Sequence, residues 1–316
     1  MREIGGYIEL DTYRDQMLHE DGILLNSGRG CLWYLLKARK IRKIVLPLYC
    51  CDCVREACAK VGTEVRYFSV DEQFLPRDVQ LEEGEWLYLV NHYGQLTQEQ
   101  IRRLKAQYGR LIVDEAQAYF AEPVTGVDTL YTCRKFFGVA DGGILYTDAD
   151  LAEELVTDES FARMGFLLGR YERTASEFYA DYVANNEIFA EEGTKRMSKL
   201  TQNLLHALDY DFIRERRRAN FEFLDRALRK YNRLSVHSVD GAFAYPLMVE
   251  HGADIRKALI AEKIYIPCLW PNVLDDAEKG SWDYQLAADI LPLPVDQRYG
   301  LEDMEYLAEE VQRCIS

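Results

Sequence analysis

The chain has 316 residues, of which 48% are hydrophobic and 29% are charged, a composition typical of a folded protein larger than one average domain. These values exclude fibres, short disulfide-stapled miniproteins and disordered chains. With 38 Lys and Arg against 53 Asp and Glu, the formal net charge is −15. Because such a charge repels polyphosphate and anionic membranes, we expect no nucleic-acid partner and no membrane partner.

The N-terminal stretch MREIGGYIELDTYRD is charged from its start and lacks the apolar core of a secretory signal. No apolar run approaches the roughly 20 residues that a membrane helix needs. We therefore expect a cytoplasmic protein with reduced cysteines. Cys50, Cys51, Cys53 and Cys58 crowd together, but no second cysteine pair or nearby His completes a tetrahedral set, so we expect no metal.

From Lys43 to Asp148, short β-branched or aromatic runs alternate with amphipathic stretches, which predicts a mainly parallel sheet covered by helices. Gly62 and Gly109 are the expected helix ends. In chain order the predicted elements are the strand KIVLP (43–47), the helix CVREACAKVG (53–62), the strand EVRYFSV (64–70), the buried strand WLYLVNHY (86–93), the helix QEQIRRLKAQYG (98–109), the buried strand RLIVDEA (110–116), and the shorter strands TLYTC (129–133) and GGILYTD (142–148).

Residues 149–230 contain no Pro and are rich in helical patterns, so we expect a helical region that wraps the sheet. Beyond it, a small α+β domain is predicted, and we place the large domain at 1–215 and the small one at 216–316. Its elements are the strand AFAYPLMVE (242–250), the helix ADIRKALIAEKI (253–264), the Pro-bounded strand around ILPLPV (290–295) and the helix LEDMEYLAEEVQRC (301–314).

Three segments of the first part could carry chemistry, because each lies at the edge where open α/β sheets bind ligands. In LNSGRGCLWYLL, the residues Ser27, Gly28, Arg29 and Gly30 begin an apolar helix, whose free amides and dipole suit a phosphate. The same residues are also typical of an ordinary helix start, with Ser27 as the N-cap beside flexible glycines. A dinucleotide fingerprint is excluded because Trp33 stands where its third glycine belongs.

The second segment, LIVDEAQAYF, is an apolar strand that ends on Asp114 and continues to Gln117. A carboxylate that emerges from a buried strand is costly unless it meets a cation, although an Asp there can also cap the next turn.

The third segment, TLYTCRKFFGVADGGILYTD, places Lys135 just past a strand and next to Tyr131, Phe136 and Phe137. Packing among these rings would desolvate the amine and favour its neutral, nucleophilic form, whereas most lysines are solvated surface charges. A phosphate cradle, an Asp that needs a cation and a nucleophilic Lys are together the three attachments of pyridoxal 5′-phosphate.

With these motifs, the chain resembles the DegT/StrS-type sugar aminotransferases, which are fold type I pyridoxal-phosphate enzymes. SGRGCL is similar to the family's Ser-Gly-Thr phosphate loop, VNHYGQ to its Tyr-Gly-Gln segment and DEAQA to its Asp-Ala-Ala-Gln-Ala. The resemblance implies an α/β fold with a mainly parallel seven-stranded sheet and a small C-terminal α+β domain. It also implies that Asp114 contacts the pyridine nitrogen, Gln117 the phenolic oxygen, Lys135 the aldehyde carbon as a Schiff base, and Thr132 the phosphate.

The sequence departs from this family at two positions. Where the family stacks an aromatic ring on the cofactor, the chain has Cys51, with Tyr49 two residues earlier, so both are candidates for the pyridine face. The family's Asn that reaches the phosphate of the neighbouring subunit falls at Thr194. His92, at the end of the WLYLV strand, is either a further cofactor contact or a hydrogen-bonded structural residue.

The resemblance implies a homodimeric aminotransferase that uses pyridoxal 5′-phosphate to move an amino group from an amino acid to a keto sugar or related acceptor. One alternative is a pyridoxal-phosphate lyase or racemase, because the same three anchors serve those reactions. The other is a catalytically silent cofactor-binding regulatory protein, which Cys51 and the short chain suggest.

Three further features are open to two readings each. The basic run Arg214, Arg216, Arg217 and Arg218 attracts a sugar-nucleotide phosphate or is a solvated helix face. Trp270 walls a substrate pocket or packs between the domains, and Arg298 clamps a substrate carboxylate or forms a structural ion pair.

Overall fold

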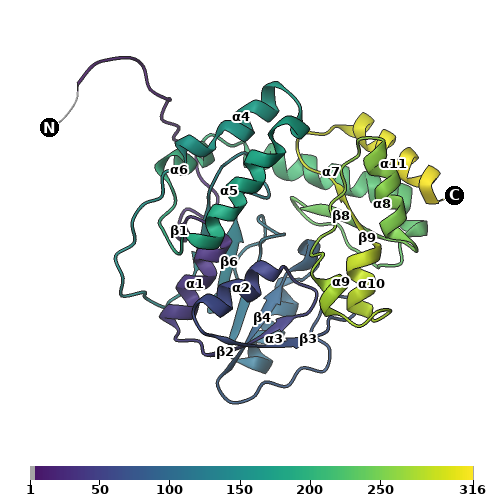
Figure 1. Ribbon diagram of the computed structural model, residues 1–316, viewed down its shortest axis with the longest axis horizontal. Coiled ribbons are helices and arrows are strands. Elements are labelled where there is room, and N and C mark those ends of the chain that lie inside the picture. Colours follow the sequence, from purple (N-terminus) through teal and green to yellow (C-terminus); the bar gives the residue numbers. More distant parts are fainter. Residues whose placement is uncertain (1–3, 316) are drawn as a thin grey trace.

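A seven-stranded sheet forms the base of the molecule in the computed structural model, which describes residues 4–315 (Figure 1). Its strand order is β1-β7-β6-β5-β4-β2-β3. The strands β3, β2, β4, β5 and β6 are parallel to one another, whereas β7 is antiparallel to β6, and β1 is antiparallel to β7. The predicted mainly parallel sheet is therefore confirmed, with the short edge strand β1 added to it. The strands are β1 Ile23–Leu25, β2 Lys43–Pro47, β3 Glu64–Phe68, β4 Glu85–Val90, β5 Leu111–Asp114, β6 Asp128–Thr132 and β7 Gly143–Tyr146.

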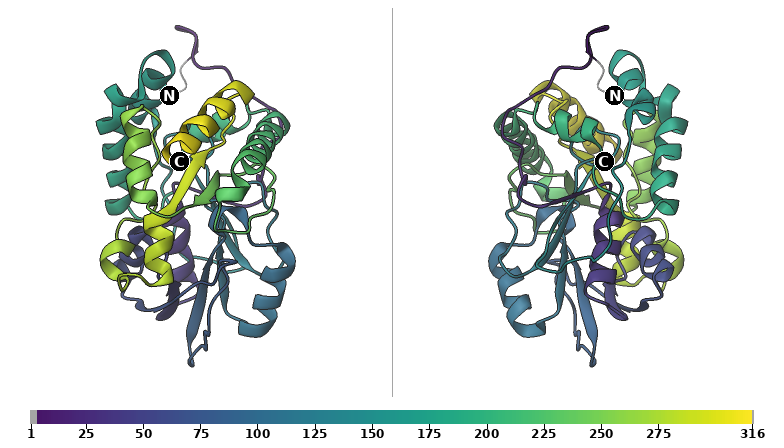
Figure 2. Two further views of the ribbon diagram at one scale, coloured as in Figure 1. Left: turned by 90° about the vertical axis from the view of Figure 1, so that its right-hand side faces the viewer. Right: turned by 90° about the vertical axis from the view of Figure 1, so that its left-hand side faces the viewer.

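Helices cover both faces of this sheet, with α1 and α2 on one face and α3 on the other (Figure 2). The predicted glycine helix ends are confirmed, since Gly62 has φ 71° and Gly109 has φ 70°, a region that side chains with a Cβ rarely adopt. Thr97 and Gln100 form a capping box that starts α3. The bounds are α1 Gly28–Ala38, α2 Asp52–Lys60 and α3 Gln98–Tyr108.

The expected helical region is present, but its helices do not all lie on the sheet. α5 packs against α1 and α2, whereas α7 packs against α11 and β8 of the C-terminal part. Arg196 returns the chain to the sheet edge by bridging to Leu25. The bounds are α4 Gly165–Glu172, α5 Tyr179–Glu191, α6 Lys199–Leu205 and α7 Tyr210–Leu228.

The C-terminal part contains the predicted α+β elements and shares its core with α7. Phe221 and Leu224 of α7 pack with Leu247, Leu293 and Leu307. The expected boundary at 215–216 thus falls inside a continuous helix. The bounds are β8 Ala244–Met248, antiparallel to β9 Ile290–Pro294, with α8 Gly252–Ala261, α9 Val273–Asp276, α10 Trp282–Asp289 and α11 Leu301–Ile315.

Residues between α8 and β9 pack on the sheet domain, which joins the two parts. Trp270, Val273 and Leu286 belong to the same buried cluster as Ile44 and Leu87 of the sheet. Within residues 4–315, no helix is both long enough and apolar enough to cross a bilayer.

Candidate functional site

The first turn of α1 lies tightly against the sheet. The Ser27 hydroxyl accepts a hydrogen bond from the Gly30 amide at 3.0 Å, so Ser27 is an N-cap and the amides of Gly28 and Arg29 have no acceptor within the helix. A Cβ on Gly143 would lie 2.5 Å from the Ser27 carbonyl, so only glycine permits this approach. A Cβ on Gly28 would lie 3.8 Å from the Thr132 Cβ, which brings Thr132 beside the free amides.

Asp114 ends β5 as a buried carboxylate with an exposed fraction of 8%. Its Oδ2 accepts a hydrogen bond from the Tyr88 hydroxyl at 2.7 Å, and its Oδ1 accepts one from the Ala116 amide at 2.8 Å. Burial raises the pKa of Asp114, while the Lys135 ammonium and these two hydrogen bonds oppose that rise. The carboxylate is therefore fixed in place, and a cationic partner would stabilise its charge.

Gln117 presents a fixed amide donor next to Asp114. Its Oε1 accepts a hydrogen bond from the Tyr93 amide at 2.7 Å, and Tyr93 itself has the left-handed φ of 55°. This bond orients the side chain, so its Nε2 faces the other way. That Nε2 is buried and has no hydrogen-bond partner in the described part of the chain. A buried donor without a partner is unfavourable, so this position suits a ligand oxygen.

Lys135 follows β6 but is not held among the rings that the sequence suggested. Tyr131, Phe136 and Phe137 belong to a separate buried cluster, whereas Lys135 is exposed and its Nζ lies 5.7 Å from the centroid of the Phe243 ring. The expectation of a lysine desolvated by its three neighbours is therefore wrong. The turn sends the rings of Phe136 and Phe137 into the core and leaves the side chain of Lys135, which precedes them, exposed.

The loop that carries Lys135 is anchored by the C-terminal part of the chain. The Phe136 carbonyl accepts hydrogen bonds from the guanidinium of Arg217 at 3.2 Å and from the side-chain amide of Gln297 at 2.9 Å. Arg217 also donates to the Ala242 carbonyl at 3.0 Å. Sequence reasoning missed this role because Arg217 stands in a basic run, and only the fold shows that this arginine alone is fully buried.

Tyr49 and His92 belong to a buried ring cluster with Phe74 and Trp270. The Tyr49 ring stacks on His92 at 5.2 Å, and Trp270 meets Tyr49 edge-on at 4.6 Å. His92 Nε2 bonds the Tyr49 carbonyl at 2.8 Å, and burial lowers the pKa of His92 to about 4. These contacts favour His92 as a neutral structural residue that supports Tyr49, and they favour Trp270 as packing between the two parts.

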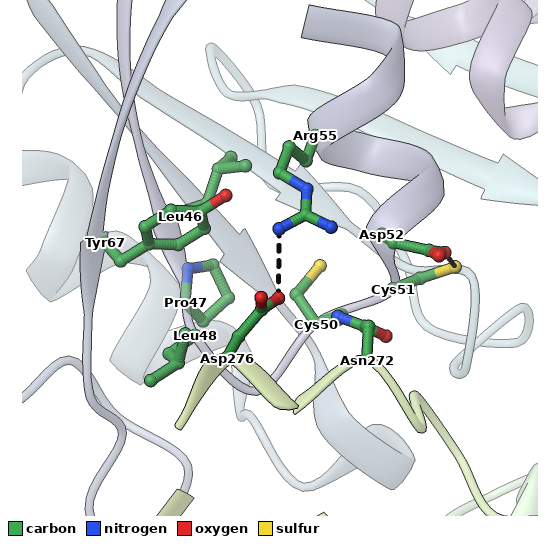
Figure 3. A pocket seen from close by; sticks show the side chains of 10 residues that line it. All are labelled: Leu46, Pro47, Leu48, Cys50, Cys51, Asp52, Arg55, Tyr67, Asn272 and Asp276. Atoms are coloured by element: carbon green, nitrogen blue, oxygen red, sulfur yellow. Dashed lines mark hydrogen bonds and ion pairs between the residues drawn. The ribbon is translucent and has the colours of Figure 1, made fainter. Parts of the chain in front are cut away.

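Cys51 is partly buried at the start of α2, where Figure 3 shows its sulfur beside Asp52. The same view shows how the C-terminal part docks there. Arg55 forms a 3.0 Å ion pair with Asp276, and the Asn272 side chain donates to the Cys50 carbonyl at 3.2 Å. The hollow between them, about 10 Å³, has room for one water molecule at most. It is a docking contact and not a substrate pocket.

Two of the remaining cationic candidates, Arg298 and Arg218, have structural partners. Arg298 forms an ion pair with Asp296 at 2.6 Å, and Arg218 forms one with Asp240 at 3.2 Å on the surface. All eight cysteines are free, and no group of His, Cys, Asp and Glu in the part of the chain that the structure describes could hold a metal ion.

No protein-family model and no curated protein matches the chain. Its structure resembles that of the sugar aminotransferase CalS13 from Micromonospora echinospora, with 15% identity, a TM-score of 0.64, and 92% of this chain and 86% of that chain covered. The likeness to S. venezuelae DesV in complex with a ketimine intermediate has 16% identity, a TM-score of 0.66 and coverages of 92% and 84%.

A third similar structure is that of NtdA from Bacillus subtilis with bound cofactor PMP, with 15% identity, a TM-score of 0.65, and 93% of this chain and 73% of that chain covered. At these identities the comparisons show the fold. The chain has the fold of the sugar aminotransferases, with its seven-stranded sheet and its set of covering helices, as the sequence resemblance predicted.

Proposed function

We propose that this chain is a pyridoxal-phosphate-dependent aminotransferase that moves an amino group from an amino acid to a keto sugar or related keto acceptor. The observation that carries the proposal is that Asp114 ends β5 and Lys135 follows β6, the adjacent parallel strand, while the Lys135 charge opposes the rise that burial causes in the pKa of Asp114. An amine and a carboxylate that needs a cation thus share one site at the carboxyl edge of the sheet. The sugar aminotransferases of the same fold support the choice of reaction.

The residues present fit the cofactor. The unpartnered Nε2 of Gln117 suits the phenolic oxygen, and the Asp114 carboxylate suits the protonated pyridine nitrogen. The free amides at the start of α1, next to Thr132, suit the phosphate. When bound, pyridoxal 5′-phosphate supplies the electron sink for the negative charge that develops at the α-carbon of the amino donor.

The protein's own residues position groups and move protons. Asp114, fixed by the Tyr88 hydroxyl and the Ala116 amide, holds the proton on the pyridine nitrogen. Lys135 Nζ takes the proton from the α-carbon of the donor and returns a proton on the way to product. The bonds from Arg217 and Gln297 to the neighbouring carbonyl fix the backbone from which this amine reaches into the site.

Binding of the cofactor tests this proposal directly. The purified chain with pyridoxal 5′-phosphate should absorb in the visible, and borohydride should fix the cofactor's mass on Lys135, whereas Lys135→Ala should show neither. Glutamate should then convert the cofactor to its amine form, and a keto-sugar acceptor should reverse that change. A chain that binds no cofactor at any concentration refutes the proposal. Release of pyruvate or ammonia would instead favour a lyase, and binding without exchange of the α-proton a silent binding protein.

We further propose that the chain acts in the cytoplasm as a homodimer whose parts 1–215 and 216–316 close over the site. The support for a dimer is a group of exposed apolar side chains that no other residue within 4–315 covers. The N-terminal segment leaves the body of the molecule (Figure 1), and several of its side chains are exposed, as are others on α4, α5 and their neighbours. They are Ile4, Tyr7, Ile8, Phe161, Leu168, Tyr171 and Tyr179.

Light scattering during size exclusion should give twice the chain mass. Replacing Tyr171 and Tyr179 with Ser should shift the protein toward the monomer. A wild-type monomer at micromolar concentration would contradict the dimer and leave the cofactor proposal intact.

A further inference from the structure

Two arginines beside the start of α1 are held by the same residue of α5. The guanidinium of Arg29 donates to the backbone carbonyl of Asn186 at 3.0 Å, and that of Arg134 donates to the side-chain oxygen of Asn186. The Nε atoms of both arginines are buried and lack a hydrogen-bond partner within residues 4–315. Two cationic donors therefore lie near each other without an acceptor for either Nε.

Arg134 is unfavourably placed for a residue with no ligand. Its guanidinium packs 4.7 Å from the centroid of the Phe189 ring. Burial lowers its pKa to about 10, and the charges of Arg29 and Arg163 act in the same direction. A partly buried cation beside two others is unfavourable for the fold unless an anion joins them.

The acidic groups near Arg134 are already committed. Asp141 accepts hydrogen bonds from the Ser198 amide at 2.8 Å, from the Ser198 hydroxyl at 2.7 Å and from the Thr201 hydroxyl. Asp158 pairs with Arg163 at 2.5 Å. Neither carboxylate forms an ion pair with Arg29 or Arg134 in the described part of the chain, so an outside anion would be their first full partner.

The arginine pair lies next to the proposed cofactor site. Arg29 lies in the first turn of α1, whose free amides neighbour Thr132. Arg29 directly follows Gly28 and Arg134 follows Thr132 by two residues, so both arginines lie beside the point where Gly28 and Thr132 meet.

We infer that Arg29 and Arg134, together with the first turn of α1, form a phosphate-monoester site built within one chain, and that this site holds the phosphate of the proposed cofactor. The inference rests on the proposed function and specifies its phosphate contacts. Two guanidinium groups match the charge of about −1.5 to −2 that a phosphate monoester carries at neutral pH. Thr194, where the resembling family supplies a contact across subunits, instead donates to the Gly30 carbonyl of its own chain at 3.1 Å.

The experiment compares pyridoxal 5′-phosphate with pyridoxal, which lacks the phosphate, by absorbance titration of the full chain. Arg134→Gln should weaken binding of the phosphorylated form about 10- to 100-fold, as expected for one charged hydrogen bond, and binding of pyridoxal less than about threefold. Arg134→Lys, which keeps the charge, should recover part of the loss. Arg163→Gln is the matched control, because Arg163 packs on the same Phe189 ring but already pairs with Asp158, and it should leave the ratio unchanged.

Thermal melting of the ligand-free chain separates binding from folding. Arg134→Gln should melt at or above the wild-type temperature, because it removes a partly buried charge that has no ion-pair partner within residues 4–315. Equal losses of pyridoxal and pyridoxal 5′-phosphate affinity, or an unchanged ratio of the two, would overturn the inference. A large drop in the melting temperature would also overturn it, since it would show that Arg134 serves the fold.

Inorganic phosphate distinguishes this inference from the proposed function. It should raise the melting temperature of Lys135→Ala as much as that of the wild type, and that of Arg134→Gln clearly less. Protection of Lys135→Ala by phosphate, without any cofactor mass on Lys135 in the wild type, would retain the phosphate site and refute the aminotransferase. Cofactor mass on Lys135 in the wild type, without any protection of Lys135→Ala by phosphate, would retain the aminotransferase and refute this phosphate site.

Discussion

Replacing Glu115 with Gln should stabilise the protein at neutral and alkaline pH. Glu115 is 1% exposed, and its Oε2 accepts one hydrogen bond from the Asn91 side chain at 2.8 Å. Burial foremost raises the pKa of Glu115 to about 8, with the nearby Asp114 charge adding to the rise. A Gln in its place keeps an oxygen for Asn91 and carries no charge to bury.

The sign and size of the effect follow from the two protonation states. Between about pH 4.5 and 8 the unfolded chain loses this proton while the folded chain keeps it, so stability falls as the pH rises. The full loss is about 5 kcal/mol, of which about 3 kcal/mol is present at pH 7. Glu115→Gln removes the loss, so its advantage over the wild type should be near zero at pH 4.5 and should increase up to about pH 8.

Urea unfolding at several pH values measures this difference. The variant and the wild type should share one m-value and separate in midpoint as the pH rises. Glu83→Gln, which removes an exposed carboxylate from the same domain, is the control and should follow the wild type at every pH. If Glu115→Gln also follows the wild type from pH 5 to 9, Glu115 titrates normally in the folded chain and the burial argument is wrong.

Two further predictions concern the site. Gly143→Ala would place a Cβ 2.5 Å from the Ser27 carbonyl and displace the start of α1, so we expect a loss of about 1–3 kcal/mol in the free energy of unfolding together with weaker cofactor binding. Gly138→Ala is the control, because a Cβ at Gly138 meets no other atom within 4 Å. Equal melting curves for the two variants would contradict the packing of Gly143 against Ser27. Tyr88→Phe removes a hydrogen bond that lowers the pKa of Asp114, so the acid limb of cofactor binding should move upward by less than about one pH unit, and an unchanged limb would exclude Asp114 as the group that titrates.

The sequence could predict the sheet because its strands are buried on both faces and read as continuous apolar runs. KIVLP and LIVD carry that signal, whereas the three-residue strand β1 at the sheet edge is too short to show a period. Ser27, Asp114 and Lys135 stand at the C-terminal ends of β1, β5 and β6, which run in the same direction, so the sheet brings these residues to one edge.

The surroundings of these residues could not be predicted, because they depend on contacts between distant segments. The aromatic residues beside Lys135 predicted a lysine packed among their rings, but the turn buries Phe136 and leaves Lys135 exposed. Arg134 showed no signal either, since its partner Asn186 lies on a helix far along the chain. The hydrogen bond of Arg217 to the carbonyl beside the lysine is hidden in the same way.

That last contact also fixes the order in which the site can be completed during synthesis. The loop carrying Lys135 leaves the ribosome early, but Arg217 and Gln297, which hold its backbone, follow much later. Domains generally fold from the N-terminus as they emerge. A nascent chain that has folded only its sheet therefore carries Lys135 on a loop without these two hydrogen bonds. The loop reaches its final position only after nearly the whole chain has been made.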